Sequence, residues 1–146
     1  MTAAATILVH ATCVCWDGGA VLLRGQPGSG KSDLALRLID AGAMLVADDQ
    51  VALTVDDGRL LAMPPPVIAG LLEVRGVGLV RLPYRRRADV VLAVDLVPAE
   101  QVPRLPEPDE VEVAGVALPR YTLHPFAASA VAKMRLLIRR QWPAGP

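Results

Sequence analysis

The residues best suited to chemistry form one short glycine-rich segment near the N-terminus. Residues 25–32 read Gly25-Gln26-Pro27-Gly28-Ser29-Gly30-Lys31-Ser32 and match the phosphate-binding P-loop pattern G-x-x-x-x-G-K-[ST]. In such a loop, backbone N–H groups surround phosphate oxygens, the lysine neutralises the β- and γ-phosphates, and the last hydroxyl binds Mg²⁺. The segment therefore predicts a site for a nucleoside triphosphate and Mg²⁺.

Two adjacent carboxylates, Asp48 and Asp49, follow the short apolar run Met44 to Ala47. A nucleotide site needs a second metal anchor, which is usually a carboxylate at the end of a nearby strand. Neighbouring side chains of an extended segment point in opposite directions, so Asp48 can face Mg²⁺ while Asp49 accepts a proton from an alcohol. The alternative is a solvated acidic turn, because paired acids also cap turns.

The elements around this segment fit the role of a P-loop. Ala20 to Arg24 is a short aliphatic run typical of a strand, and Asp33 to Ala41 repeats apolar residues at helical spacing. Upstream, Thr6 to Cys15 reads as a strand, and Asp17-Gly18-Gly19 predicts a hairpin turn into the next strand. The sequence thus predicts strand, loop and helix in the order that phosphate binding requires.

The rest of the chain predicts further strands and one closing helix. Asp56-Asp57-Gly58 indicates a second hairpin. Pro66 to Leu82 is interpreted as a short helical or loop segment that carries catalytic residues. Pro98 to Glu110 is interpreted as a surface connection. The remaining expected elements are strands at Met44 to Ala47, Val51 to Val55, Arg59 to Met63, Ala88 to Leu96, Val111 to Val116 and Leu118 to Leu123, and a helix at Phe126 to Trp142, before a frayed tail at Pro143 to Pro146.

Composition bounds the class of protein. The 146 residues are 53% hydrophobic but only 3% aromatic, which favours a single α/β domain over residues 1–146 with a mixed sheet covered by helices. The net charge of zero gives no electrostatic reason to expect nucleic acid or a membrane as partner. We found no leader or membrane-spanning run and expect a cytoplasmic protein. Cys13 and Cys15 are expected to be reduced, buried thiols.

Three motifs together resemble the catalytic domain of bacterial HPr kinase/phosphorylase. They are the P-loop at residues 25–32, Val46-Ala47-Asp48-Asp49, and Leu72-Glu73-Val74-Arg75-Gly76-Val77-Gly78. The resemblance implies a P-loop fold similar to the HPr kinase and phosphoenolpyruvate carboxykinase catalytic core. It also implies phosphorylation of a serine on HPr, the phosphocarrier of the sugar phosphotransferase system, with ATP and Mg²⁺, and a homo-oligomer, which in the family is a hexamer.

The resemblance also assigns residue roles. It implies that Lys31 holds the phosphates, that Ser32 and Glu73 join Asp48 as Mg²⁺ ligands, and that Asp49 accepts the proton in the kinase direction. His10 matches the family's active-site histidine, and Arg75 lies within the catalytic loop, where it could face phosphate or form a surface ion pair. Arg81 and the run 85–87 form a basic cluster that could meet a protein substrate or simply be solvated.

The sequence departs from the family pattern in two ways. We expect a minimal catalytic form that lacks the family's N-terminal domain. Ser129 stands where an active-site arginine is expected, which weakens the case for phosphorolysis and favours the kinase direction; Arg135, Arg139 or Arg140 could substitute for that arginine. Two alternatives stay open: a P-loop kinase acting on a small molecule, and a nucleotide-dependent regulatory module without chemistry.

Overall fold

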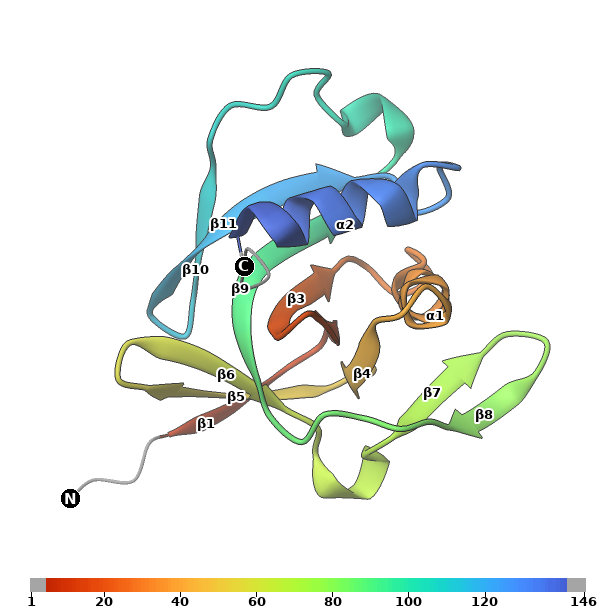
Figure 1. Cartoon of the computed structure of the whole chain (residues 1–146), viewed down its shortest axis with the longest axis vertical. Helices are drawn as coiled ribbons and strands as arrows, with labels where there is room; N and C mark the ends of the chain where they lie inside the picture. The colour runs from red at the N-terminus through yellow and green to blue at the C-terminus, as the bar shows by residue number, and fades with distance from the viewer. Residues whose placement is uncertain (1–4, 142–146) are drawn as a thin grey trace.

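A nine-stranded mixed sheet with two helices forms the fold, in a computed structural model that describes residues 5–141 (Figure 1). The strands of this sheet are β1 (Thr6–Val9), β2 (Thr12–Trp16), β3 (Gly19–Arg24), β4 (Met44–Ala47), β5 (Val51–Asp56), β6 (Arg59–Met63), β9 (Ala88–Leu96), β10 (Glu110–Val113) and β11 (Val116–Leu123). The helices are α1 (Lys31–Asp40) and α2 (Ala130–Gln141), with short 3₁₀ turns at Pro66–Ile68 and Ala99–Gln101. The α/β class with a mixed sheet is therefore confirmed.

The long strand β9 organises the sheet. It pairs in parallel with β3 along one edge; along the other edge its start pairs with β6 and its end pairs in parallel with β11. The order continues from β3 to β2 and β4 on one side and from β6 to β5 and β1 on the other. In Figure 1, β9 curves through the middle of the molecule between these groups.

Four strands end at the same edge of this sheet. β3, β9 and β11 run in parallel, and β4 has the same direction because it is antiparallel to β2, which is antiparallel to β3. The carboxyl ends of parallel strands are where α/β proteins bind ligands. The glycine-rich segment follows β3 and the two aspartates follow β4, so topology alone brings both motifs to one edge.

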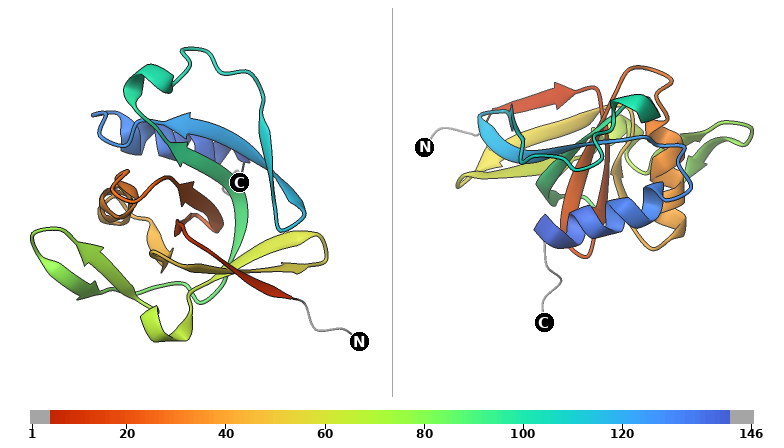
Figure 2. Two further views of the ribbon diagram at one scale, coloured as in Figure 1. Left: turned by 180° about the vertical axis from the view of Figure 1, so that it is seen from behind. Right: turned by 90° about the horizontal axis from the view of Figure 1, so that it is seen from above.

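Each face of the sheet has its own apolar cluster. Leu34 and Leu38 of α1 and Met134 of α2 pack in one cluster with Val14 and Leu92 of the sheet, which places both helices on the same face (Figure 2). The opposite cluster joins side chains of the curved sheet with those of its β5–β6 and β10–β11 hairpins. Alternation along β2 separates Cys13 and Cys15, which point to this second cluster, from Val14 on the helix face.

Most elements next to the glycine-rich segment agree with the sequence prediction. The β2–β3 hairpin turns at Asp17-Gly18, both with positive φ, and α1 begins two residues before the predicted start and ends before Ala41. The prediction of one strand over Thr6 to Cys15 was wrong. The chain bends at His10, so that β1 pairs with β5 while β2 pairs with β3 and β4.

The segment Pro66 to Leu82 was predicted only in part: a short 3₁₀ turn is present at Pro66–Ile68, but the rest is not a helix or loop. It contains a β-hairpin of β7 (Leu71–Val74) and β8 (Gly78–Arg81), which forms a small second sheet that projects from the body of the molecule (Figure 1). Leu72 is fully buried in the cluster on the helix face, while Glu73 faces solvent. The sequence did not reveal this alternation, because two glycines interrupt it. Gly76 and Gly78 both adopt positive φ where the chain reverses between the two strands.

Two later boundaries were shifted. The turn between the last strands lies at Ala114-Gly115 rather than at Ala117, because Ala114 and Gly115 adopt the positive φ that the turn needs. The last helix begins at Ala130, since residues 125–129 form turns, and the predicted end at Trp142 and the tail lie outside the described residues.

The cysteines agree with the sequence prediction. Cys13 and Cys15 are buried and free of any disulfide, and burial raises the pKa of both thiols. Within residues 5–141, neither helix is long and apolar enough to cross a membrane.

Candidate active site

The glycine-rich segment connects β3 to α1 and buries its lysine. Lys31 is 8% exposed, and its Nζ donates to the carbonyl oxygens of Gly25 and Gln26 at 2.7 and 3.0 Å. Gly30 caps α1 in the left-handed conformation with φ of 101°, which a residue with a side chain rarely adopts. The hydroxyl of Ser29 is buried without a partner among the described residues. The segment thus presents a cation and a helix N-terminus to an anion.

Asp48 is the polar centre of the site. Its carboxylate is 6% exposed, and its Oδ1 accepts hydrogen bonds from the hydroxyls of Ser32 at 2.8 Å and Thr12 at 2.9 Å. Its Oδ2 lies 3.4 Å from the backbone nitrogen of Glu73. Three segments that are distant in the sequence therefore meet on one buried carboxylate.

Asp49 turns to the opposite side and pairs with His10. Its Oδ1 lies 2.9 Å from Nε2 of His10, and the two side chains are 74% and 52% exposed. This reversal is not strand alternation, because Asp49 lies two residues after the end of β4 and has a φ of 70°. The arrangement leaves an accessible carboxylate with a basic ring beside it.

The electrostatics of the site centre on Lys31. Burial lowers the pKa of its ammonium group, and the charges of Asp48 and Asp49 partly offset this effect by favouring the charged form. A cation removed from water in this way interacts strongly with a phosphate that enters the site.

The oxygen atoms around Asp48 suit a hard cation. Mg²⁺ is usually bound by one or two protein oxygens together with substrate phosphates and water. Within residues 5–141 there is no cluster of three His, Cys, Asp or Glu side chains that could hold a metal by themselves. The half-buried Ser32 hydroxyl and the buried Asp48 carboxylate, 2.8 Å apart, are oxygen ligands of the kind that Mg²⁺ shared with a nucleotide uses, so these residues fit the ion.

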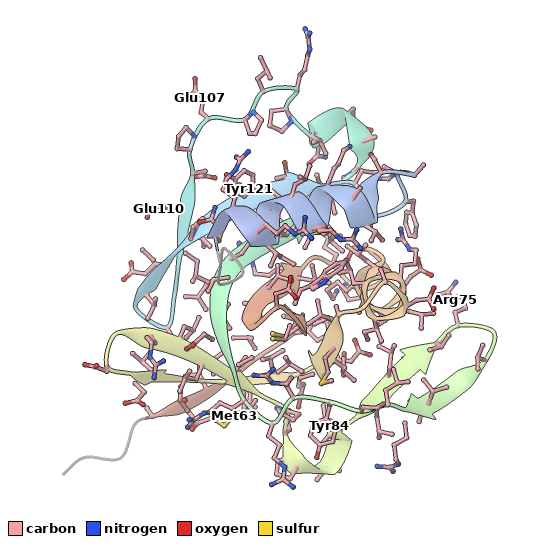
Figure 3. The ribbon with its side chains drawn as sticks, in the orientation of Figure 1. Met63, Arg75, Tyr84, Glu107, Glu110 and Tyr121 are labelled. Carbon is pink, nitrogen blue, oxygen red and sulfur yellow. The ribbon has the colours of Figure 1, made fainter. Side chains whose placement is uncertain are left out.

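Two predicted residues lie on the projecting hairpin. Glu73 lies on β7 with its backbone against Asp48 and its side chain exposed. Arg75 is exposed at the hairpin turn (Figure 3) and forms no hydrogen bond or ion pair with the described residues. The hairpin therefore brings Glu73 close to the phosphate-binding segment and leaves Arg75 at its outer end.

Two arginines of α2 contact aromatic side chains of the sheet. Arg135 stacks on Trp16, with its guanidinium carbon 4.8 Å from the ring centroid, and Trp16 lies at the opposite end of β2 from Thr12. Arg140 donates to the hydroxyl of Tyr121 on β11. Ser129, at the position expected for an arginine, is exposed just before α2.

Two features of the site were missed by sequence reasoning. Thr12 is completely buried and gave no signal, because a threonine in a strand is ordinary.

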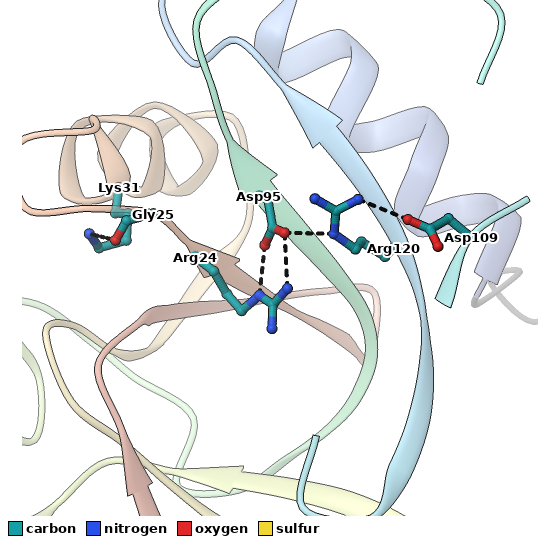
Figure 4. Close-up of polar contacts among 6 residues, drawn as sticks. All are labelled: Arg24, Gly25, Lys31, Asp95, Asp109 and Arg120. Atoms are coloured by element: carbon teal, nitrogen blue, oxygen red, sulfur yellow. Dashed lines mark hydrogen bonds and ion pairs between the residues drawn. The ribbon is translucent and has the colours of Figure 1, made fainter. Parts of the chain in front are cut away.

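On the other side of the P-loop, Asp95 is held by Arg24 at 2.6 and 2.9 Å and by Arg120 at 2.7 Å, and Arg120 also reaches Asp109 at 2.8 Å (Figure 4). The parallel register of β3, β9 and β11 was needed to find this network.

Comparison with known proteins agrees with this geometry. The family model described as "HPr Serine kinase C-terminal domain" matches residues 1–133. HPr kinase/phosphorylase of Geobacillus thermodenitrificans is 36% identical over 135 residues, which cover 82% of this chain and 43% of that protein. The enzyme of the same name from Clostridium tetani is 43% identical over 75 residues, which cover 51% of this chain and 25% of that protein.

The architecture agrees as well. The solved structure of the HPr(Ser) kinase/phosphatase from Coxiella burnetii superposes with a TM-score of 0.82 at 26% identity, covering 92% of this chain and 95% of that chain. This chain spans less than half the length of the curated relatives named above. From its motifs, its fold and the family match over residues 1–133, the chain belongs to the family of HPr serine kinase C-terminal domains.

Proposed function

We propose that this protein is an ATP-dependent kinase that phosphorylates a serine of the phosphocarrier protein HPr. The observation that carries the proposal is the position of the Asp49–His10 pair beside the buried Lys31 and Asp48 at one edge of the sheet. Relatives with names that refer to HPr support the choice of substrate.

In the proposed reaction, the serine hydroxyl of HPr attacks the γ-phosphorus of ATP. The new oxygen–phosphorus bond forms as the bond to the β–γ bridging oxygen breaks, the hydroxyl proton passes to Asp49, and ADP leaves. Lys31 stabilises negative charge on the phosphates, and His10 holds the carboxylate of Asp49 in position. Mg²⁺, held by Ser32 and Asp48 with Glu73 nearby, would offset phosphate charge when bound.

The exposure of the proposed base favours a protein substrate. With Asp49 74% and His10 52% exposed, the acceptor side is open and unlike the enclosed pockets that bind small molecules. The exposed basic residues Arg81 and Arg85 to Arg87 lie on and after the β7–β8 hairpin and offer positive charge to a partner. We therefore favour HPr over a small-molecule acceptor.

The direct test is mass spectrometry of the organism's HPr after incubation with this protein, Mg²⁺ and ATP. We expect one serine phosphate with the unaltered protein and none with Lys31→Ala. Asp49→Asn should retain ATP binding and lose at least a hundredfold in transfer rate, because general-base catalysis contributes about 10²–10⁴-fold.

A matched control is available in the β5–β6 turn. Asp57 is also exposed with positive φ, at 54°, so Asp57→Asn makes the same chemical change outside the site and should leave transfer unchanged. ATP binding without HPr phosphorylation by the unaltered protein would instead support a regulatory module. A cytoplasmic location, a kinase reaction with at most residual phosphorolysis, and homo-oligomeric assembly stay predictions of the sequence.

A further inference from the structure

An open groove of about 960 Å³ lies beside the P-loop, on the side away from Asp49. Its floor and walls come from the P-loop and from the segments that follow β9 and β11, including Val97, Gln101, His124 and Phe126. Its volume is in the range of pockets that hold ligands the size of a nucleotide. Apart from the P-loop, none of the residues that line this groove has a role in the reaction proposed above.

The strand order decides which part of a nucleotide the groove can receive. β3, which leads into the P-loop, lies between β9 on one side and β2 and β4 on the other. The transferred phosphate must lie on the β4 side, near Asp48 and Asp49. A triphosphate bound across the P-loop therefore directs its other end towards β9 and β11, where the groove lies.

The wall of the groove is fixed by hydrogen bonds. Val97 donates its N–H to the carbonyl of Leu123 at 3.0 Å, and Nδ1 of His124 lies 3.1 Å from the carbonyl of Val97. Arg37 of α1 donates to the carbonyl of Pro125. Because a carbonyl only accepts, Nδ1 of the neutral ring carries the proton and Nε2 is left as an acceptor.

Phe126 is an exposed aromatic ring held against the P-loop. A Cβ atom added to Gly30 would lie 2.9 Å from its Cζ, and its ring meets the edge of His124 at a centroid distance of 5.8 Å. The side chain is nevertheless 60% exposed. An anchored ring with a free surface beside a phosphate site is suited to stacking on a nucleobase.

The opposite wall offers hydrogen-bond donors. Asp95 accepts three bonds from Arg24 and Arg120, and Asp109 accepts a fourth, so further N–H groups of both guanidiniums remain for a ligand (Figure 4). Asp95 is saturated by these bonds and keeps the two arginines in place. Guanidinium donors and the His124 acceptor match ribose hydroxyls and the heteroatoms of a base.

We propose that this groove binds the nucleoside of the phosphate donor, with its base stacked on Phe126. The inference rests on the proposed kinase function, because it extends the same triphosphate site. It assigns phosphate binding to the P-loop and nucleoside binding to the segments after β9 and β11, so the two parts of the ligand can be tested separately.

The test compares ATP with inorganic tripolyphosphate by isothermal titration of the full chain in the presence of Mg²⁺. We expect Phe126→Ala to weaken ATP binding about tenfold and to leave tripolyphosphate binding unchanged, because only ATP loses a stacking partner. Phe126→Tyr should restore ATP affinity. Lys31→Ala should weaken both ligands.

A matched control is Leu136→Ala on α2, which removes a similarly exposed apolar side chain, 66% exposed, outside the groove. Equal weakening of ATP and tripolyphosphate by Phe126→Ala, or no effect on either, would overturn the nucleoside site and leave the phosphate site intact. If the unaltered protein binds tripolyphosphate as tightly as ATP, the groove contributes nothing to affinity and the inference fails. If it binds neither ligand, the proposed kinase function itself is wrong.

Discussion

Asp48 and Asp49 are neighbours in sequence but have opposite surroundings. Asp48 is 6% exposed and bonded to two hydroxyls, whereas the side chain of Asp49 is 74% exposed and, among residues 5–141, is paired only with His10. A buried carboxylate fixed by several donors is a good anchor, and an accessible one beside a histidine can exchange a proton. The positive φ of Asp49 creates this division of roles.

Thr12 provides the first prediction, because it is fully buried and its hydroxyl fixes Asp48. Thr12→Val keeps the shape of the side chain but removes a buried bond to a charged group, which is worth about 1.5–3 kcal/mol. We expect the Mg²⁺ concentration for half-maximal transfer to rise roughly tenfold, with a smaller effect on the melting temperature. Thr12→Ser should restore the Mg²⁺ requirement. An unchanged Mg²⁺ requirement in Thr12→Val would limit this residue to a structural role.

At the scale of elements, the Arg24–Asp95–Arg120 network ties together three parallel strands. Burial raises the pKa of Asp95, but the hydrogen bonds and charges of the two arginines outweigh burial and hold its pKa below the ordinary value. Stability from such a group is fully present above the pKa of the unfolded chain, near 4, and is lost as pH falls towards the folded value.

The second prediction follows from the lowered pKa of Asp95. Asp95→Asn should lower the free energy of unfolding by about 1–2 kcal/mol at pH 7 and by less at pH 3, because the stability from the ionised carboxylate declines once the pH falls below the unfolded pKa near 4. Thermal melts at both pH values measure this difference. Asp109→Asn is the control, since Asp109 is 52% exposed and accepts the outer bond from Arg120 together with one from the backbone N–H of Glu110. A loss for Asp95→Asn that is equal at both pH values would contradict the ionic origin.

The third prediction concerns the β7–β8 hairpin, which holds Glu73 next to Asp48. Gly70 and Gly76 both have positive φ, at 77° and 85°. A Cβ atom at Gly70 would lie 2.9 Å from Cδ1 of Tyr84 and 3.0 Å from the carbonyl of Leu82, whereas a Cβ at Gly76 meets nothing within 4 Å. Gly76→Ala should cost only backbone strain, about 1 kcal/mol, and Gly70→Ala about 2–4 kcal/mol. Chemical denaturation measures the free energy of unfolding of both variants. Similar decreases for the two would show that Tyr84 and Leu82 move aside at little cost.

An element could be predicted when the residues that determine it lie together in one continuous segment of the sequence. The P-loop and its flanking strand and helix were predictable because residues 25–32 are a continuous pattern. The hairpin at residues 71–81 was not, because the burial of Leu72 depends on α1 and the main sheet. The contacts of Thr12 with Asp48 and of His10 with Asp49 join residues 36 and 39 positions apart, so only the pairing of β2 with β4 reveals their geometry.

At the scale of the whole molecule, ATP would connect segments that follow different strands of the sheet. The phosphates would contact the P-loop and the end of β4, and the nucleoside would contact the segments after β9 and β11. A ligand that binds only the folded state stabilises it by about 2.7 kcal/mol at a hundred times its dissociation constant. For a chain of this size we expect ATP at that level to raise the melting temperature by about 5–10 °C.

The last prediction is the pattern of that stabilisation, measured by amide hydrogen exchange with mass spectrometry. Tripolyphosphate with Mg²⁺ should slow exchange in residues 25–34 and around Asp48, because local opening of the phosphate site becomes costlier when it is occupied. ATP should protect these residues and, in addition, residues 97–101 and 124–128. The β10–β11 turn at Ala114-Gly115 lies at the other end of β11 and serves as an internal reference that neither ligand should alter. The same map from both ligands would place the nucleoside outside the groove, and uniform protection of the whole chain would mean that the sheet edge does not open independently of the core.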